Sequence, residues 1–426
     1  MDFWDQMVDC ICRPPRDTYS PEQLLGSPAG SKFPIGPVLV QRSDFELTNK
    51  RGAKLQCSHY APVATQHGPL KGRDGKLPVV VYCHCNSGSR RDAEEAVGHL
   101  LPMGIGVVAF DFMGSGLSDG QWVTLGYTEA EDLGGKFDPH NHTTALVTAS
   151  AVPGFFSVLA AVVVEWLRER DDISAVGLWG RSMGAVTALL YASKDAAISG
   201  MVLDSPFSRL TDLMSEIVKD TGLPIPKALV RVVSSLMRRS VKRKAGFDIC
   251  DVAPLDAVGG SVVPAVFGHA TGDSFINVSH SEKLVAAYGG EYKNLVRFGG
   301  DHNHFRPKFF YDSVTMFFHQ QAGGNFAAKN FLPAGGAPTA GRALPAFFKM
   351  DERLPGHTDY LMQYEELLGA ARGRLDPSAL MRYESRDLAR ANGGVNQPWH
   401  VSSGRGAGVR LWESPRAHVF GLIDRV

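Results

Sequence analysis

A serine between two glycines stands where a strand-like run gives way to a helix-like run. Residues 175–179 are apolar, Gly180-Arg181-Ser182-Met183-Gly184 follows, and residues 185–193 read AVTALLYAS. A strand, G-x-S-x-G and a helix in this order are typical of a tight turn that lifts a nucleophilic serine above a sheet. Glycines two residues before and after the serine leave room for that turn. The pattern predicts Ser182 as a nucleophile, and a plain strand-to-helix turn is the alternative.

A serine hydroxyl needs a histidine to accept its proton and a carboxylate to orient that histidine. In this arrangement the acid and the base follow the serine along the chain. Two acids follow predicted strands after Ser182: Asp204 in VLDSPF and Asp273 in VFGHATGDSFI. We prefer Asp273, because it lies in the loop after the penultimate strand. Asp204 is interpreted as a cap of the turn at residues 205–207.

Two histidines follow the last predicted strand in GGDHNHFRP. His302 is nearer the strand end and follows flexible glycines, so we predict it as the base, and we expect His304 to lie outside the site. Residues 301–304 and Cys83-His84-Cys85 also contain metal-ligating residue types. Neither group has a matching second cluster in the sequence, so we expect no metal and no other cofactor.

The elements that would position these residues are short apolar runs separated by helical stretches. A hairpin is predicted over 44–49 and 55–61, and later strands over 77–83, 106–110, 175–179, 200–203, 265–269 and 294–298. Short apolar strands spaced by helices are typical of a parallel sheet covered on both faces. The predicted class is therefore α/β, with a mostly parallel doubly wound sheet whose chemistry collects beyond the carboxyl ends of the strands.

Composition limits the function classes. The 426 residues include 44 basic and 44 acidic side chains, so charge gives no reason to expect nucleic acid as a partner. Six cysteines are too few for a disulfide framework in a chain of this length, which favours a reducing compartment. The first residues lack the pattern of a secretory signal, and we expect a cytoplasmic protein.

We predict an N-terminal segment at 1–43, a catalytic domain at 44–320 and a largely disordered tail at 321–426, with a short helix near 359–371. The uncharged run at 143–164 is long enough to cross a bilayer, but it lies between two strands of one sheet. We therefore interpret it as a buried helix ending at residue 168, preceded by an inserted loop at 134–154.

Two further segments bear on the substrate. Residues 207–251 are predicted as a small helical cap. Its apolar positions would suit an acyl group if they face the pocket. The alternative is that these positions simply pack on the sheet. A short amphipathic helix at the N-terminus carries Cys10 and Cys12. Cysteines beside such a helix are candidates for S-acylation, which would add peripheral membrane contact. Asp2, Asp5 and Asp9 argue against it.

Seven separated stretches, among them VVYCHCNSGSR, AFDFMGSGLSDG, GLWGRSMGAVTALLY and FGGDHNHFRPKFF, resemble the serine-aminopeptidase-like branch of the α/β-hydrolases. They are similar to plant and protist proteins related to the animal depalmitoylases. The resemblance implies the α/β-hydrolase fold, the Ser182, Asp273 and His302 triad, and an oxyanion hole from the N–H groups of Met183 and Asn86. Relatives have glycine where this chain has Cys85, and they lack the insertion at 134–154.

The sequence thus predicts a serine hydrolase that cleaves a carboxylic ester or thioester, with a small acyl ester or an acylated protein as substrate. An aminopeptidase-like amide hydrolase is one alternative. A non-catalytic protein of the same fold is another, because the side chain of Cys85 could spoil the oxyanion loop.

Overall fold

The fold is described from a computed structural model, which describes residues 3–65, 68–70, 75–134, 163–220 and 227–321. The predicted insertion at 134–154 and the predicted tail at 321–426 lie outside these residues, apart from the first residue of each. The short helix predicted near 359–371 lies outside them as well. None of the described helices combines the length and the apolar character that a membrane crossing requires.

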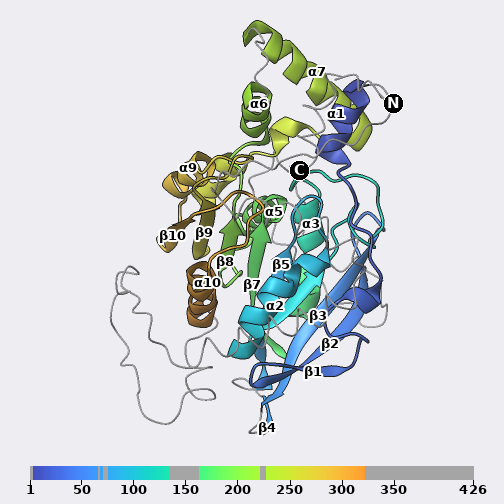
Figure 1. Cartoon of the computed structure of the whole chain (residues 1–426), viewed down its shortest axis with the longest axis vertical. Coiled ribbons are helices and arrows are strands. Elements are labelled where there is room, and N and C mark those ends of the chain that lie inside the picture. Colours follow the sequence, from blue (N-terminus) through green and yellow to red (C-terminus); the bar gives the residue numbers. More distant parts are fainter. Residues whose placement is uncertain (1–2, 66–67, 71–74, 135–162, 221–226, 322–426) are drawn as a thin grey trace, which may run out of the picture.

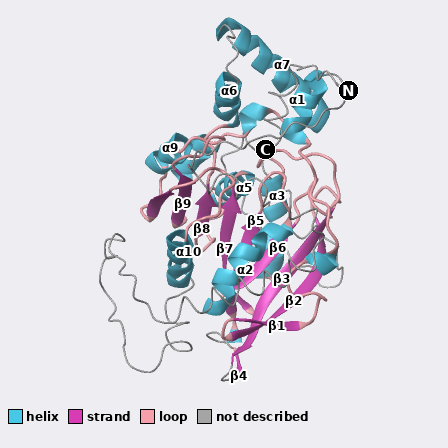
Figure 2. Cartoon of the chain, viewed as in Figure 1, coloured by secondary structure: helices cyan, strands magenta, loops and turns pink. Residues whose placement is uncertain are grey.

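A single sheet runs through the molecule (Figure 2). Its order is β1-β2-β3-β6-β5-β7-β8-β9-β10, with β4 paired to β3. The pairs from β6 to β10 are parallel, whereas β1, β2 and β3 are antiparallel to their neighbours. The strands are β1 Lys32–Ile35, β2 Val38–Thr48, β3 Lys54–Thr65, β4 Gly68–Pro69, β5 Leu77–Cys83, β6 Gly106–Phe110, β7 Ile173–Arg181, β8 Met201–Asp204, β9 Ala265–Ala270 and β10 Lys293–Phe298.

The order of the strands reverses beside β5. The chain passes from β5 outward to β6 and then returns to β7 on the other side of β5. In open α/β sheets ligands bind outside the carboxyl ends of the strands at such a reversal. The loop after β5 and the turn after β7 therefore lie side by side at the same edge of the sheet, and these two segments carry Asn86 and Ser182.

Helices cover both faces of the sheet (Figure 1). Their bounds are α1 Phe3–Cys12, α2 Glu94–Leu100, α3 Glu129–Leu133, α4 Val163–Arg168, α5 Met183–Ala192, α6 Leu210–Asp220, α7 Lys227–Ala245, α8 Pro254–Ala257, α9 Ser279–Ala287 and α10 Lys308–Gln321. The predicted helix end at residue 168 agrees with the end of α4.

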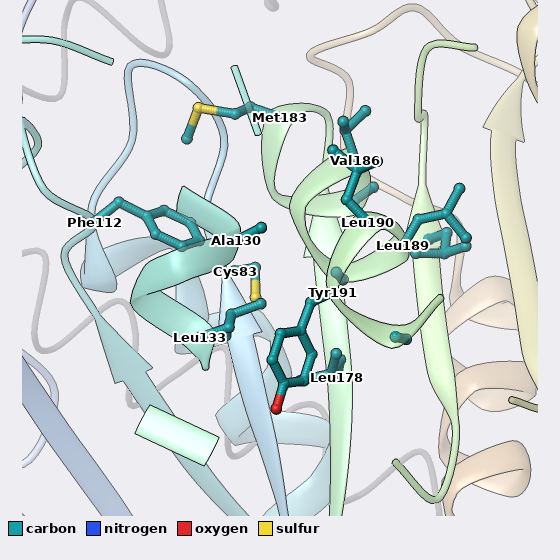
Figure 3. Close-up of a cluster of buried hydrophobic side chains, with 14 of the residues drawn as sticks. Cys83, Phe112, Ala130, Leu133, Leu178, Met183, Val186, Leu189, Leu190 and Tyr191 are labelled. Atoms are coloured by element: carbon teal, nitrogen blue, oxygen red, sulfur yellow. The ribbon is translucent and has the colours of Figure 1, made fainter. Parts of the chain in front are cut away.

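Two buried clusters form the core, one on each face, and β5 contributes to both. Val79, Val81 and Cys83 point into the cluster shared with α3, α4 and α5, whereas Val80 and Tyr82 point into the cluster shared with α2 and α10. Alternate side chains of a strand leave opposite faces of the sheet, so a strand buried on both faces must be apolar throughout. Figure 3 shows Cys83 in the first cluster with side chains of α3, α5 and β7. The doubly wound α/β prediction is confirmed.

The sheet starts earlier than predicted. β1 and β2 begin at Lys32 and Val38, so the predicted domain start at residue 44 is too late. Pro34 and the Gly36-Pro37 pair read as turn signals in the sequence. β1 is an edge strand with one neighbour, and an edge strand tolerates proline because not every N–H must pair.

The predicted cap and the predicted N-terminal helix lie together beyond the carboxyl ends of the strands, where α6, α7 and α1 gather (Figure 1). Lys244 of α7 is 2.7 Å from Asp9 of α1. Arg238 and Lys242 of α7 both pair with Asp248.

The surroundings of Cys12 bear on the S-acylation expected at the N-terminal helix. Cys12 is fully buried, its Sγ donates to the carbonyl of Val8 at 3.2 Å, and burial raises the pKa of the thiol to about 11. S-acylation needs an accessible thiol with thiolate character, so Cys12 is not an acceptor in this structure. The side chain of Cys10 lies outside the described ones.

Candidate active site

The turn after β7 is strained at Ser182. Its backbone adopts φ +53° and ψ −116°, which costs an ordinary residue about 1–3 kcal/mol. A Cβ on Gly180 would lie 2.2 Å from the carbonyl oxygen of Gly184, and a Cβ on Gly184 would lie 1.9 Å from that of Cys83. Both glycines are therefore required, the first by the turn itself and the second by the close approach of α5 to the end of β5.

Three loops bring the predicted acid, base and nucleophile together. Nε2 of His302 is 3.2 Å from Oγ of Ser182, and Nδ1 of His302 is 2.7 Å from Oδ2 of Asp273. Because a carboxylate accepts only, Nδ1 carries the proton and the lone pair of Nε2 faces the serine hydroxyl. Ser182 and His302 are 8% and 7% exposed, so each is buried except for a small solvent-accessible part. The geometry supports proton transfer from Ser182 to His302.

Asp273 is held as an anion. Its Oδ1 accepts from the N–H groups of Phe275 and Ile276 at 3.0 and 2.7 Å. Desolvation by burial favours the neutral carboxyl. The nearby N–H groups of His269, His302 and Ile276 outweigh it and hold the pKa of Asp273 well below its usual range. An ionised acid can orient the imidazole and stabilise its protonated form.

The rejected histidine and acid have other partners. Nδ1 of His304 accepts from the N–H of Asp301 at 3.1 Å. Asp204, interpreted as a cap of the turn at 205–207, accepts from Oγ of Ser205 in that turn at 3.2 Å. Its carboxylate also accepts two hydrogen bonds from the guanidinium of Arg306, at 2.8 and 3.0 Å, which the sequence did not indicate. Burial alone would raise the pKa of Asp204, but the charge of Arg306 lowers it by a larger amount, so the net shift is downward.

The predicted oxyanion loop follows β5 and is firmly held. Nδ1 of His84 donates to the carbonyl of Cys85 at 2.6 Å, and Nε2 of His84 accepts from the N–H of Phe112 at 3.1 Å. Sγ of Cys85 lies 3.6 Å from Oδ2 of Asp92. The side chain that this chain has in place of the relatives' glycine therefore points toward Asp92 in η3, the short helix Arg90–Ala93. Burial raises the pKa of the Cys85 thiol to about 12, so it stays protonated at neutral pH.

The other predicted oxyanion donor is the N–H of Met183, the first residue of α5. The first N–H groups of a helix have no partner within the helix, and the helix dipole favours a negative charge beside them. Asn86 stands in the loop against which Gly184 packs, which places both predicted donors around the same turn. Their roles remain predictions.

Within the described ranges, no three histidine, cysteine, aspartate or glutamate side chains converge as metal ligands would. In the Cys83-His84-Cys85 stretch, both ring nitrogens of His84 already have protein partners and Cys83 lies in the core. These contacts give the stretch a structural role beside the site.

A second serine–histidine–carboxylate cluster was not predicted. Nδ1 of His280 in α9 is 2.7 Å from Oγ of Ser208, and its Nε2 is 2.8 Å from Oε2 of Glu216 in α6. Ser208 and His280 are fully buried. No local motif marks these residues, because the contacts join positions 64 and 72 residues apart along the chain.

Comparisons with known proteins agree with this fold. A family model described as alpha/beta hydrolase fold matches residues 78–227. The uncharacterised protein YqkD of Bacillus subtilis is 21% identical over 265 residues, which cover 62% of this chain and 73% of that protein.

Solved structures of similar fold include two esterases. The Pyrococcus furiosus esterase Pf2001 is 20% identical with a TM-score of 0.48, and the match covers 73% of this chain and all of that one. Est1E from Butyrivibrio proteoclasticus is 18% identical with a TM-score of 0.43, covering 65% and 98%. With the sheet order described above, the family match establishes that this chain has the α/β-hydrolase fold.

Proposed function

We propose that this α/β-hydrolase-fold protein is a serine hydrolase that cleaves carboxylic esters or thioesters through an acyl-enzyme. The observation that carries the proposal is the continuous hydrogen-bonded line from Ser182 through His302 to Asp273, with the serine at a strained turn. The sequence resemblance to the serine-aminopeptidase-like branch supports the same assignment of roles.

In the proposed reaction, Oγ of Ser182 attacks the substrate carbonyl carbon while its proton passes to Nε2 of His302. The negative charge on the carbonyl oxygen is stabilised by the N–H groups of Met183 and Asn86. The tetrahedral intermediate collapses, and the leaving group departs with the proton from His302. Water then repeats the sequence on the acyl-enzyme, releases the acid and restores the serine.

An apolar acyl group is the favoured substrate portion. The ring of Phe275 packs edge-on against His302, with ring centroids 5.2 Å apart. On α6, Leu210 and Leu213 are buried in the core, whereas Met214 and Ile217 are only partly buried against it. Partly buried apolar side chains beyond the carboxyl ends of the strands, where α6 lies, suit an acyl chain better than a charged amino terminus. The substrate class therefore includes acyl esters, acyl thioesters and acylated proteins.

The test is a substrate panel on the purified full chain: p-nitrophenyl esters of increasing acyl length, acyl thioesters and an aminoacyl anilide. We expect the esters and thioesters to be hydrolysed, Ser182→Ala to abolish the activity, and Ser208→Ala to retain it. Faster cleavage of the anilide would favour the aminopeptidase-like alternative. A folded wild type that cleaves none of them and resists a fluorophosphonate would favour the non-catalytic alternative.

A further inference from the structure

Asp273 contacts a second imidazole besides that of His302. His269, which is the fifth residue of β9, is fully buried, and its Nε2 lies 3.4 Å from the same carboxylate oxygen, Oδ2, that Nδ1 of His302 contacts. Nε2 of His269 is also 2.8 Å from the carbonyl oxygen of Ile276, and Nδ1 is 2.7 Å from Oγ of Ser281 in α9. Each ring nitrogen of His269 therefore has a defined partner.

These partners fix where the proton of His269 lies. A carbonyl oxygen and a carboxylate oxygen can only accept, so Nε2 must carry a hydrogen, which it donates to the carbonyl of Ile276 at 2.8 Å while facing Oδ2 of Asp273 at 3.4 Å. The hydroxyl of Ser281 can donate to Nδ1, which satisfies the neutral ring completely. The donor that faces Asp273 is thus held in place by groups from β9, from the loop after it and from α9.

We propose that His269 is a positioning residue of the hydrolytic reaction: its Nε2–H, held by Ile276 and Ser281, shares the charge of the Asp273 carboxylate and so sets how strongly that carboxylate holds the proton of His302. The inference rests on the proposed function. With His269 included, the line of contacts comprises five side chains, from Ser281 through His269, Asp273 and His302 to Ser182.

The physical reason is the low polarity of the site. A buried carboxylate without enough donors takes up a proton or binds its histidine too tightly, and either change removes the free base. The N–H of His269, 3.4 Å from the carboxylate, is among the causes that keep the pKa of Asp273 well below its usual range against desolvation. Other charged groups also face this pair: Asp301 lies beside Asp273, and Asp204, Arg181 and Arg306 lie around the His302 loop. None of these four donates to the Asp273 carboxylate among the described contacts.

Two amide variants separate this role from plain packing. In His269→Gln the longer side chain can place an N–H donor near the original Nε2, whereas in His269→Asn the amide reaches only the position of Nδ1. Both keep a polar side chain of smaller volume in the same cavity. The measurement is the rate at which a fluorophosphonate labels Ser182 as a function of pH, because labelling needs only the nucleophile and its base.

For wild type we expect labelling to rise with pH, because the attack of Ser182 needs a base at His302 that does not already carry the proton. In His269→Asn the carboxylate is more basic and holds that proton more strongly. The acid limb, which is the low-pH part of the curve of labelling rate against pH, therefore moves to higher pH by about one pH unit. At a pH below the limb this is about a tenfold lower labelling rate. In His269→Gln the limb stays with that of wild type. Identical limbs in all three proteins, or equal displacement in both variants, would overturn the inference.

If His269→Asn does not fold, Ser281→Ala takes its place. The ring of His269 then loses its partner on Nδ1 and is held by Ile276 alone, so its Nε2–H faces Asp273 less firmly. A smaller displacement in the same direction is expected, and no displacement overturns the inference. A wild type that labels normally while the variants show no displacement refutes only this inference. A folded wild type that is not labelled refutes the proposed function itself.

Discussion

Two clusters in this molecule join a serine and a carboxylate through one histidine, yet they differ in orientation and access. In the first, Ser182 faces Nε2 of His302 and Asp273 faces Nδ1. In the second the ring is reversed: Ser208 contributes both its hydroxyl and its N–H to Nδ1 of His280, and Glu216 faces Nε2. The residue types are nearly the same.

The difference teaches that a triad is defined by its backbone as much as by its side chains. Ser182 lies at a strained turn, is slightly exposed and directly precedes the ten-residue helix α5. The first N–H groups of that helix can stabilise an oxyanion. Ser208 is fully buried, and its own N–H uses the lone pair of His280 that a base would need. The second cluster therefore ties α6 to α9 and cannot reach a substrate in this structure.

The largest expected effect separates the two serines. Ser182→Ala should lower kcat by about 10⁴-fold or more, since the nucleophile is lost, with little change in melting temperature. Ser208→Ala should leave kcat within about threefold and lower the melting temperature by roughly 2–4 °C, because a buried hydrogen bond is lost. Ester hydrolysis and thermal unfolding of both variants measure this. Equal loss of activity in both would remove the distinction.

The two carboxylates should differ in the same way. Asp273→Asn preserves shape but presents the wrong hydrogen-bonding group to Nδ1 of His302, and we expect kcat to fall about 10⁴-fold. Glu216→Gln, which alters the half-buried carboxylate of the second cluster, should retain most of the activity. Steady-state kinetics at a pH above the acid limb give the comparison. A comparable loss in Glu216→Gln would show that α6 acts on the site.

The third acid, Asp204, should matter for stability. Its side chain and that of Arg306 are 4% and 1% exposed and form a buried ion pair. Asp204→Ala leaves the guanidinium buried without its partner, which should lower the free energy of unfolding by about 3–5 kcal/mol. The matched control is Asp172→Ala, which breaks the exposed pair with Arg170 and should lower it by less than about 1 kcal/mol. Denaturant unfolding of both variants decides the case.

The same pair predicts a pH dependence. Burial opposes ionisation of Asp204, but Arg306 lowers its pKa below that of the unfolded chain. The pair therefore stabilises the fold fully above the unfolded pKa of about 3.9, and this stability is lost as the pH falls through the lower folded pKa. The difference in melting temperature between wild type and Asp204→Ala should thus narrow below about pH 4. A constant difference would contradict the assignment.

The smallest effect is expected at the oxyanion loop. Because Sγ of Cys85 points toward Asp92, restoring glycine in Cys85→Gly should change kcat by less than about threefold. A Gly88→Ala variant is the contrasting change, since a Cβ there would lie 2.0 Å from Oδ2 of Asp92 and displace the loop. A tenfold or larger gain in Cys85→Gly would show that cysteine does impair the site.

Features produced by residues adjacent in the chain could be predicted from the sequence, whereas features produced by residues far apart in the chain could not. The Ser182 turn follows from five adjacent residues, and the apolar strands carry their own signal, so both are visible locally. The role of Asp204 depends on Arg306, 102 residues away, and the contacts of His280 and His269 depend on how α6 and α9 pack. Those contacts leave no local pattern. The start of the sheet was missed because proline and glycine at an edge strand resemble a loop.

The most direct test of the central claim is to map where a fluorophosphonate reacts with the folded wild-type chain. After labelling, digestion and mass spectrometry, a single adduct on the peptide that contains Ser182 is expected, with none on the peptide that contains Ser208. An adduct on Ser208, or no adduct on a chain shown to be folded, would contradict the account.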